Sequence, residues 1–410
     1  MIADSGSKAG RRGVGRAFEM LGVGKIVFGS GTADRLGPIA AGLGNRALVV
    51  SNAGPAGRGG PIDIVTETLV EHDVECAIFM QSGEPTVDDI DAALETARQG
   101  ECDLVVGLGG GSAVDTAKAT AALLTNGGSA LDYMEVIGKG LKVTKPAAPW
   151  IAVPTTAGTG AEVTKNAVVA CHEKNFKASI RGEQLLARAA VVDPELGLGV
   201  PPQTTAASGM DALCQLIESY TSNNAGPVTD ALAAEGIPRA ARSLRRVVAD
   251  GSDLAAREDM ALAALLSGIT LTNAGLGAVH GFAAPMGANF RVPHGVVCAA
   301  LLPGVMAANV RALREPDAAT EAPATLGRYA VVGRLLLARQ DQDDASAIDA
   351  GVAFVAELAE AIGIPKLGQF GVTADRVEEM VALAKKSSSM RYNPVCLSDE
   401  ALTQILSEAI

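Results

Sequence analysis

The chain has 410 residues, which is more than one typical hydrophobic core supports and therefore predicts two or more domains. Its composition is 48% hydrophobic and 20% charged, with 47 glycines, which is typical of a close-packed α/β protein and excludes a disordered one. The formal net charge of -12 argues against nucleic acid or an anionic membrane as partner, because both require basic surface. We therefore expect a small-molecule partner.

The cysteines and the N-terminus indicate a cytoplasmic protein. No CxxC pair occurs, so the sequence predicts neither a disulfide framework nor a thiolate zinc site. Residues 1–17 are basic but lack the apolar core of a secretory signal, and we expect them to form a flexible tail. Every apolar run is interrupted by Gly, Pro or polar residues before about 18 residues, so no transmembrane helix is predicted.

Residues 18–197 are expected to form an α/β domain. Short β-rich runs, namely KIVFGSG, RALVVSN, CAIFM, DLVVGLGG, WIAVPTT and AAVVDPE, alternate with helical patterns such as PIDIVTETLVEHD and TVDDIDAALETARQG. This alternation is typical of a mainly parallel sheet with helices on its faces.

A glycine-rich turn follows the fourth of these strands. In DLVVGLGGGSAVDTAKA, the residues Gly109, Gly110, Gly111 and Ser112 stand between an apolar strand and a helix. Glycines let the backbone approach a ligand closely, and the N–H groups at a helix start favour a phosphate. The stretch is neither a Walker loop nor a complete GxGxxG motif, so a turn without a ligand is the alternative.

A threonine-rich loop follows the next strand. VPTTAGTGAEVTK places the hydroxyl groups of Thr155, Thr156 and Thr159 among glycines at the carboxyl end of a strand, where open α/β sheets bind ligands. These hydroxyls can bond a ribose, a phosphate or an amide. The alternative is that they cap their own backbone.

Residues 198–410 are expected to form a second, all-helical domain, because after Pro201 and Pro202 the strand pattern ends. In the helix GMDALCQLIESY, the side chains of Asp211, Gln215 and Glu218 recur at i, i+4 and i+7 and share one face. Such a polar stripe is typical of an exposed helix face, and the alternative is that it faces a site.

An uncharged segment in the same domain contains two of the four histidines of the chain. Between residues 261 and 310 the only formally charged side chain is Arg291, so the segment is predicted to be buried. His280 and His294 lie within it, and a buried imidazole needs a hydrogen-bond partner or a metal. Both interpretations remain open from the residues alone.

Several motifs together resemble the iron-containing (group III) alcohol dehydrogenases. They are GGGSAVDTAKA, PTTAGTGAEVT, DPEL, GMDAL with IESY, GAVHGFAAPMG with VPHG, and LLPGVM, in the order and spacing of that family. The resemblance runs from about residue 22 to the C-terminus. It implies a dehydroquinate synthase-like fold, with a Rossmann-like nucleotide-binding domain, an all-α domain and an active site between them.

The resemblance also implies roles for individual residues. Those expected to bind the dinucleotide are Asn52, Glu84, Gly109, Gly110, Gly111, Ser112, Asp115, Thr155, Thr156, Thr159 and Lys177. Those at the positions of the metal ligands are Asp211, Gln215, His280 and His294, for a divalent metal such as Fe or Zn. The polar stripe would then face the cleft.

Four positions depart from the family pattern. Gln215 stands where the family has a fourth histidine ligand, and a neutral amide oxygen is a weaker donor than imidazole for iron or zinc. Ala284 stands where another histidine helps to move the alcohol proton. Asn52 replaces an aspartate that selects NAD, whereas the Glu84 carboxylate near the adenosine ribose would disfavour a 2′-phosphate. We expect NAD, with NADP as the alternative.

The implied reaction is a reversible hydride transfer between an alcohol and NAD(P), with a metal polarising the substrate oxygen. One alternative is a metal-independent reductase of the maleylacetate type, in which Arg291 or Lys177 would bind an acidic substrate. Another is a nucleotide-binding relative with lost or altered catalysis. Relatives commonly form dimers or larger homo-oligomers, so the same is expected of this chain.

Overall fold

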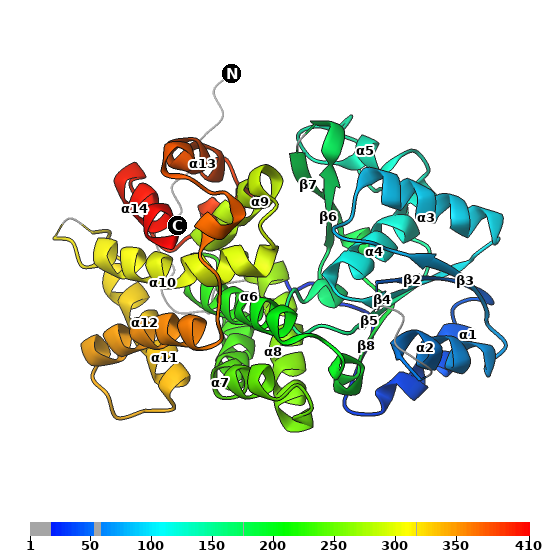
Figure 1. Cartoon of the computed structure of the whole chain (residues 1–410), viewed down its shortest axis with the longest axis horizontal. Coiled ribbons are helices and arrows are strands. Elements are labelled where there is room, and N and C mark those ends of the chain that lie inside the picture. The colour runs from blue at the N-terminus through cyan, green and yellow to red at the C-terminus, as the bar shows by residue number, and fades with distance from the viewer. Residues whose placement is uncertain (1–17, 53–58, 175, 317) are drawn as a thin grey trace, which may run out of the picture.

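The computed structural model describes residues 18–52, 59–174, 176–316 and 318–410. The expected tail, 1–17, lies outside these residues. Two lobes are visible, one built on a sheet and one made of helices (Figure 1). The predicted fold class, a parallel-sheet domain followed by a helical domain, is confirmed.

A six-stranded parallel sheet forms the first lobe, in the order β1-β8-β5-β4-β2-β3. All six predicted strands are present, as β1 (Ile26–Phe28), β2 (Arg46–Ser51), β3 (Glu75–Met80), β4 (Leu104–Gly109), β5 (Trp150–Pro154) and β8 (Ala189–Val192). β4 and β5 are buried throughout, which explains why their sequences are continuous apolar runs.

Helices cover both faces of this sheet. They are α1 (Leu36–Ala41), α2 (Pro61–Val70), α3 (Val87–Gln99), α4 (Gly111–Asn126) and the short α5 (Ala130–Tyr133). Alternate residues of β2 divide between the two faces: Val49 packs in one core with Leu36 of α1, and Leu48 packs in another with Ala117 of α4. The sheet is therefore doubly wound.

The direction of the connections reverses between β2 and β4. The chain leaves β2 towards β3 through α2, and it leaves β4 towards β5 on the other side through α4. Adjacent strands whose connections run in opposite directions leave a crevice at their carboxyl ends, where ligands of open α/β sheets bind.

Sequence reasoning missed a two-stranded antiparallel sheet between β5 and β8. It consists of β6 (Asn166–Cys171) and β7 (Phe176–Arg181). β7 (FKASIR) mixes polar and apolar residues and is largely half-exposed, whereas β6 (NAVVAC) is a mostly buried apolar run that was not recognised as a strand. β7 carries Lys177 and packs beside α9 of the helical lobe.

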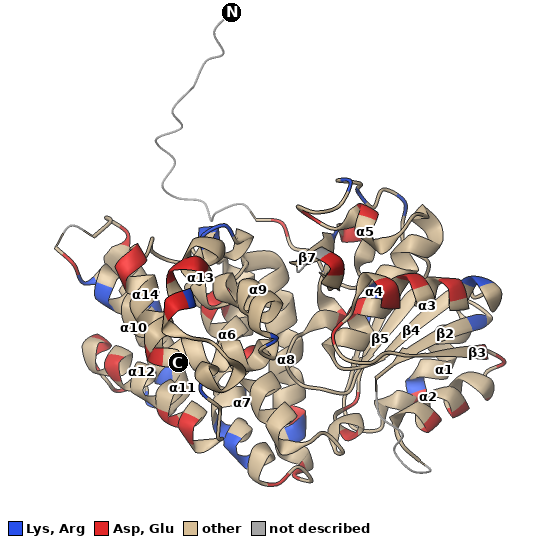
Figure 2. Cartoon of the chain, turned by 45° about the horizontal axis from the view of Figure 1, so that its top comes forward, with Lys and Arg blue, Asp and Glu red and all other residues tan. Residues whose placement is uncertain are grey.

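The helical lobe contains α6 (Pro202–Thr221), α7 (Pro227–Ala249), α8 (Leu254–Ala274), α9 (Ala278–Phe290), α10 (His294–Leu313), α11 (Ala322–Leu337), α12 (Asp344–Ala361), α13 (Val377–Ala384) and α14 (Asp399–Ala409). Charged residues lie mainly on the outer helices, whereas α9 and the strands β2, β4 and β5 are largely uncharged (Figure 2). Among the described helices, α10 alone is long and apolar enough to cross a membrane, but 67% of that stretch is buried inside the lobe. It is therefore a core helix.

Candidate active site between the two lobes

The glycine turn lies at the reversal point of the sheet. Gly109 has a φ of 140°, and a Cβ atom there would stand 2.1 Å from the side-chain oxygen of Asn52. The same Asn52 oxygen accepts a hydrogen bond from the Gly110 N–H at 3.0 Å. Asn52, at the end of β2, thus ties its strand to the turn after β4, and only glycine fits at position 109.

The threonine loop packs against this turn. A Cβ atom on Gly111 would stand 2.8 Å from the Thr159 hydroxyl, and the Thr155 N–H donates to the Gly109 carbonyl at 2.9 Å. Helix α4 begins at Gly111 without a side-chain cap, so the dipole of its first turn is directed towards this crevice. The glycine turn and the threonine loop therefore form one surface suited to a phosphate.

Asp115 has a different environment from the turn that precedes it. Its buried carboxylate accepts hydrogen bonds from Lys118 Nζ at 3.2 Å and from the Val168 N–H at 2.9 Å. Burial raises the pKa of Asp115 although both partners oppose the shift, and it lowers the pKa of Lys118. These contacts fasten β6 to α4, so Asp115 supports the crevice from within the fold.

Glu84 and Lys177 form an ion pair of 2.8 Å. The charges of both act on His294, and a Cβ atom on Gly287 of α9 would stand 3.7 Å from Lys177 Nζ. The pair therefore lies where the sheet lobe meets α9, close to the histidines. The predicted contact of Glu84 with the adenosine ribose stays a prediction. Lys177, proposed above for an acidic substrate, is already paired, and Arg291 is exposed at the end of α9.

Three of the predicted metal ligands come together from three helices. His280 Nε2 of α9 lies 3.2 Å from Asp211 Oδ1 of α6, and His294 Nε2 of α10 lies 3.6 Å from the same oxygen. Asp211 and His280 are buried, whereas 35% of the His294 side chain is exposed. The ligand atoms of a tetrahedral zinc site lie about 3.3–3.8 Å apart, given bonds of about 2.0–2.3 Å, so this spacing fits a metal.

Gln215 lies one turn after Asp211 on the same face of α6 and is 3% exposed. Its side-chain oxygen accepts a hydrogen bond of 2.6 Å from the Ser267 hydroxyl of α8. The oxygen predicted to bind the metal is therefore already engaged by a neighbouring helix.

Two residues to which sequence reasoning gave no individual role complete the surroundings of His280. Glu218 Oε2 lies 2.7 Å from His280 Nδ1, while its other oxygen accepts the Val279 N–H at 2.8 Å. Cys298 Sγ lies 3.7 Å from His280 Nε2. Glu218 was visible as the third member of the polar stripe, and Cys298 follows His294 by four residues, so the helical period was the signal for both.

The polar stripe of α6 is thus not an exposed face. Asp211, Gln215 and Glu218 are 1%, 3% and 5% exposed, and the opposite face of the helix is buried as well. Of the two interpretations of the stripe, the solvent-exposed face, favoured by the helix pattern alone, is wrong, because α8, α9 and α10 cover the polar side. Buried carboxylates need partners, and the histidines provide them.

The pKa values reflect this burial. Burial opposes protonation of His280, but Cys298, Asp211 and Glu218 outweigh it and raise the pKa of His280 well above its ordinary value. For His294, desolvation and then the positive charges of His280 and Lys177 lower the pKa to about 4, against the attraction of Asp211. His294 is therefore neutral near pH 7, which is the form that binds metals.

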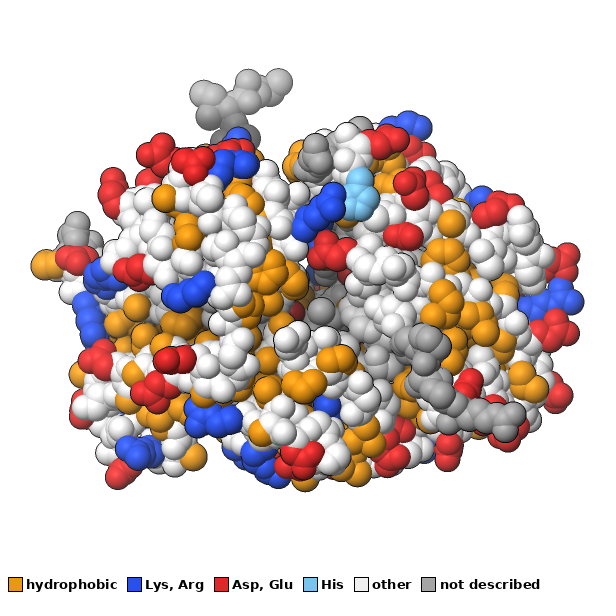
Figure 3. Space-filling view, viewed as in Figure 1, with side chains coloured by type: hydrophobic (Ala, Val, Ile, Leu, Met, Phe, Trp, Pro, Cys, Tyr) orange, Lys and Arg blue, Asp and Glu red, His pale blue; other side chains and the backbone are white. Residues whose placement is uncertain are grey.

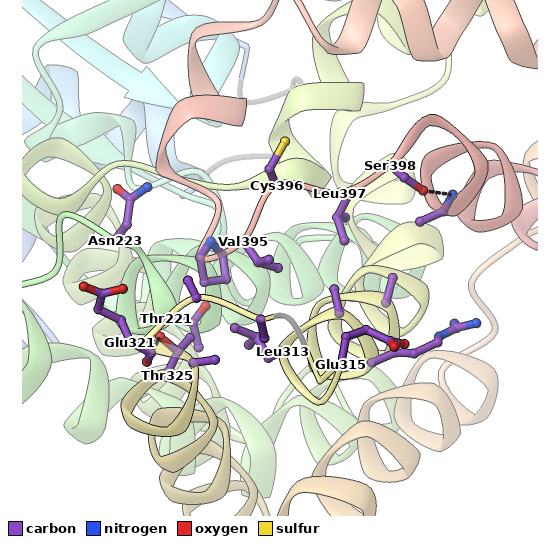
Figure 4. A pocket seen from close by; sticks show the side chains of 18 of the residues that line it. Thr221, Asn223, Leu313, Glu315, Glu321, Thr325, Val395, Cys396, Leu397 and Ser398 are labelled. Atoms are coloured by element: carbon purple, nitrogen blue, oxygen red, sulfur yellow. Dashed lines mark hydrogen bonds between the residues drawn. The ribbon is translucent and has the colours of Figure 1, made fainter.

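In the view of Figure 3, the surface has a notch between the two lobes, and charged side chains lie along its edge. A separate open cavity of about 1050 Å³ lies elsewhere, between the end of α6, α10, α11 and the segment before α14 (Figure 4). Its lining includes Thr221, Leu313, Thr325 and Cys396 but none of the clustered metal-site residues. The residues predicted as metal ligands therefore lie near the junction of the lobes and not in this cavity.

Comparisons with known proteins agree with this geometry. Residues 24–194 match the family model described as iron-containing alcohol dehydrogenase, and residues 205–410 match the model of the C-terminal part of the Fe-containing alcohol dehydrogenase family. The chain belongs to the iron-containing alcohol dehydrogenase family. The resemblance noted in the sequence is confirmed.

Individual relatives differ in their substrates. The chain is 40% identical over 293 residues to long-chain-alcohol dehydrogenase 1 of Geobacillus thermodenitrificans, covering 70% of this chain and 73% of that one. It is 34% identical to choline dehydrogenase of Bacillus subtilis, over 93% and 92% of the two chains. A solved structure of 1,3-propanediol oxidoreductase superposes with a TM-score of 0.88, at 33% identity over 96% of this chain and all of that one.

Family membership makes the chain an oxidoreductase that interconverts alcohols with aldehydes or ketones by hydride transfer to and from NAD(P), with a divalent metal. The metal-independent reductase and the relative with lost catalysis are not favoured.

Proposed function

We propose that the junction between the lobes is the active site, with NAD on the glycine turn and a divalent metal at Asp211, His280 and His294. The observation that carries the proposal is the convergence of these three donors from α6, α9 and α10, with the histidine nitrogens 3.2 Å and 3.6 Å from one Asp211 oxygen and all ligand atoms within 4.8 Å of one another. When bound, the metal would act as a Lewis acid on the substrate oxygen, and the nicotinamide would exchange the hydride.

The protein prepares the donors for that role. Glu218 accepts a hydrogen bond from His280 Nδ1, so a metal that displaces the Nε2 proton would find the lone pair on the side of Asp211 and His294. A carboxylate in this position fixes the tautomer and the orientation of a ligating imidazole. Desolvation keeps His294 neutral, and in the tautomer protonated at Nδ1 its Nε2 also offers a lone pair.

Nucleotide binding is assigned to Gly109, Gly110, Gly111 and Ser112, with Thr155, Thr156 and Thr159 beside them. Unpaired N–H groups in the first turn of α4 and the adjacent threonines support a pyrophosphate in the crevice at the reversal of the sheet. A similar solved structure, sulfoacetaldehyde reductase of Bifidobacterium kashiwanohense, is in complex with NAD+ (TM-score 0.81, 28% identity, 96% and 98% coverage), which supports NAD as the dinucleotide.

The proton of the alcohol has a different route from that of relatives with a histidine at position 284. Ala284 carries no acid or base, and it stands one turn after His280 on α9. We assign the transfer to water entering through the partly exposed edge of His294. General acid–base catalysis by a positioned side chain contributes about 10²- to 10⁴-fold. Ala284→His is therefore expected to increase turnover.

The function is tested by following NADH and NADPH oxidation with a series of short, long and cationic aldehydes, before and after chelation. Zn²⁺ or Fe²⁺ is then added back. Turnover with NADH that is lost on chelation and restored by metal supports the proposal. Undiminished turnover of protein proven to be metal-free would contradict the metal site.

The protein is further proposed to be a cytoplasmic homodimer or larger homo-oligomer. All six cysteines are free thiols, which fits a reducing compartment. Ile78 and Met80 of the edge strand β3 are 48% and 50% exposed, and an apolar sheet edge of this kind is suited to a second copy. Light scattering coupled to gel filtration measures the assembly directly.

A further inference from the structure

We propose that Cys298, and not Gln215, supplies the fourth protein ligand of the metal, so that the site is an Asp-His-His-Cys site suited to zinc. This inference rests on the proposed function, because it concerns the same metal. It replaces the ligand expected from the family pattern with a residue of different chemistry.

The first observation is the position of the thiol among the other donors. Cys298 Sγ lies 3.7 Å from His280 Nε2, and the ligand atoms of Asp211, His280, His294 and Cys298 all lie within 4.8 Å of one another. A zinc–sulfur bond of about 2.3 Å and a zinc–nitrogen bond of about 2.0 Å at the tetrahedral angle place S and N about 3.5 Å apart. The observed separation therefore needs little adjustment.

The second observation is the helical spacing. His294 and Cys298 are i and i+4 on α10, in the same relation as Asp211 and Gln215 on α6. Both pairs therefore present two side chains on one face. His280, on α9, contacts both pairs, through Asp211 and through Cys298. Cys298 thus occupies a position from which a ligand can reach the point shared by the other three.

The third observation is the state of the competing donor. The Gln215 oxygen lies 2.6 Å from the Ser267 hydroxyl, which also lies 2.8 Å from the Ala264 carbonyl, so the two oxygens share the single proton of Ser267. An amide oxygen is neutral and hard, whereas a thiolate is anionic and soft and is a preferred zinc ligand. Coordination releases the thiol proton, and the resulting thiolate binds more strongly than the amide can.

Cys214 provides a matched comparison. It is also buried, and its sulfur lies 3.9 Å from His280, but on the Nδ1 side that faces Glu218. A thiol there lies beside the supporting carboxylate and not beside Asp211 and His294. The two cysteines thus flank opposite edges of one imidazole, and only Cys298 is grouped with all three proposed ligands.

The test uses Co²⁺ as a spectroscopic replacement for zinc in the full-length protein. Wild type loaded with one equivalent of Co²⁺ is expected to show a near-ultraviolet thiolate-to-cobalt charge-transfer band together with the visible bands of a four-coordinate ion. Cys298→Ser should lose the charge-transfer band and bind Zn²⁺ at least about 10- to 100-fold more weakly, a loss seen even when a residue that only supports a ligand is removed. Cys214→Ser and Gln215→Leu should keep the band.

Several results would overturn the inference. One is wild-type protein that binds one equivalent of Co²⁺ but shows no charge-transfer band. Another is a band that persists in Cys298→Ser, and a third is a band that is lost in Cys214→Ser but kept in Cys298→Ser. The wild-type spectrum decides the question even if the Cys298→Ser variant does not fold. Each of these outcomes leaves the proposed function intact as long as aldehyde reduction depends on metal. Failure of the proposed function would instead appear as turnover without bound metal, or as no NADH-dependent turnover.

Discussion

Glu218→Gln is the substitution that most directly tests how the protein orients His280. The wild-type carboxylate accepts two hydrogen bonds, from the Val279 N–H at 2.8 Å and from His280 Nδ1 at 2.7 Å. Glutamine keeps the shape, and its oxygen can retain the bond to Val279. Its NH₂ group then faces Nδ1 and can only donate.

The glutamine therefore favours the wrong tautomer of His280. With Nδ1 as the acceptor, the ring proton moves to Nε2, which is the atom beside Asp211 and Cys298 and the one needed by the metal. Loss of a carboxylate that orients a ligating histidine costs about 10- to 100-fold in metal affinity, or about 1.4–2.7 kcal/mol. We expect a Zn²⁺ affinity lower by this factor.

The affinity is measured by competition with a chromophoric chelator, and circular dichroism and thermal melting establish that the variant is folded. Glu235→Gln is the matched control, because Glu235 lies on α7 in a surface ion pair with Arg239. It should leave the affinity unchanged. A folded Glu218→Gln protein that binds Zn²⁺ as tightly as wild type would refute the assignment of Glu218 as the residue that sets the tautomer.

Three further predictions concern the nucleotide turn, a buried carboxyl group and the metal. Gly109→Ala is expected to weaken NADH binding at least 10-fold in a fluorescence titration, since the new Cβ atom would stand 2.1 Å from the Asn52 oxygen at a φ of 140°; unchanged binding would remove the turn from the site. Burial raises the pKa of Glu162 from 4.5, its value in the unfolded chain, to about 7 in the folded protein. Ionisation of Glu162 therefore lowers the free energy of unfolding of wild type by up to about 3 kcal/mol as the pH rises from 4.5 to 8, and Glu162→Gln should not show this loss. The exposed Glu258→Gln is the control, and equal pH dependence of melting in wild type and Glu162→Gln would contradict the prediction. Wild type in Zn²⁺ at 100 times its dissociation constant should gain about 2.7 kcal/mol over chelated protein in denaturant unfolding, and the Asp211→Asn variant should gain less; an equal gain in both would exclude Asp211 as a ligand.

The strands of the first lobe, the glycine turn and the threonine loop could be predicted from the sequence because their signals are local. An apolar run between turn residues indicates a buried strand wherever it lies in the chain, and three consecutive glycines indicate a tight turn. The positions of Asp211, His280 and His294 followed from motifs whose spacing is characteristic of the family. In each case the information lies within a few adjacent residues.

Only the tertiary structure decided the contacts between distant segments. Glu218 and His280 are separated by 62 residues and Asp115 and Val168 by 53, and no periodicity relates the members of such pairs. The period of α6 revealed a polar face, but a helix pattern does not specify what packs on that face. Here it is covered by α8, α9 and α10, so residues typical of a wet surface are buried.

The same reason explains why the sequence favoured Gln215 over Cys298. A motif shows which residue stands at the position of a ligand in the family, which here is Gln215. Only the distances between side-chain atoms show which residue can bind a metal together with the other proposed ligands. Cys298 looked like one of several isolated, buried cysteines until α10 was packed against α9. The sequence determined that this chain has the fold and most of the expected donors of an alcohol dehydrogenase, and the packing of three helices determined which side chains surround the proposed metal position.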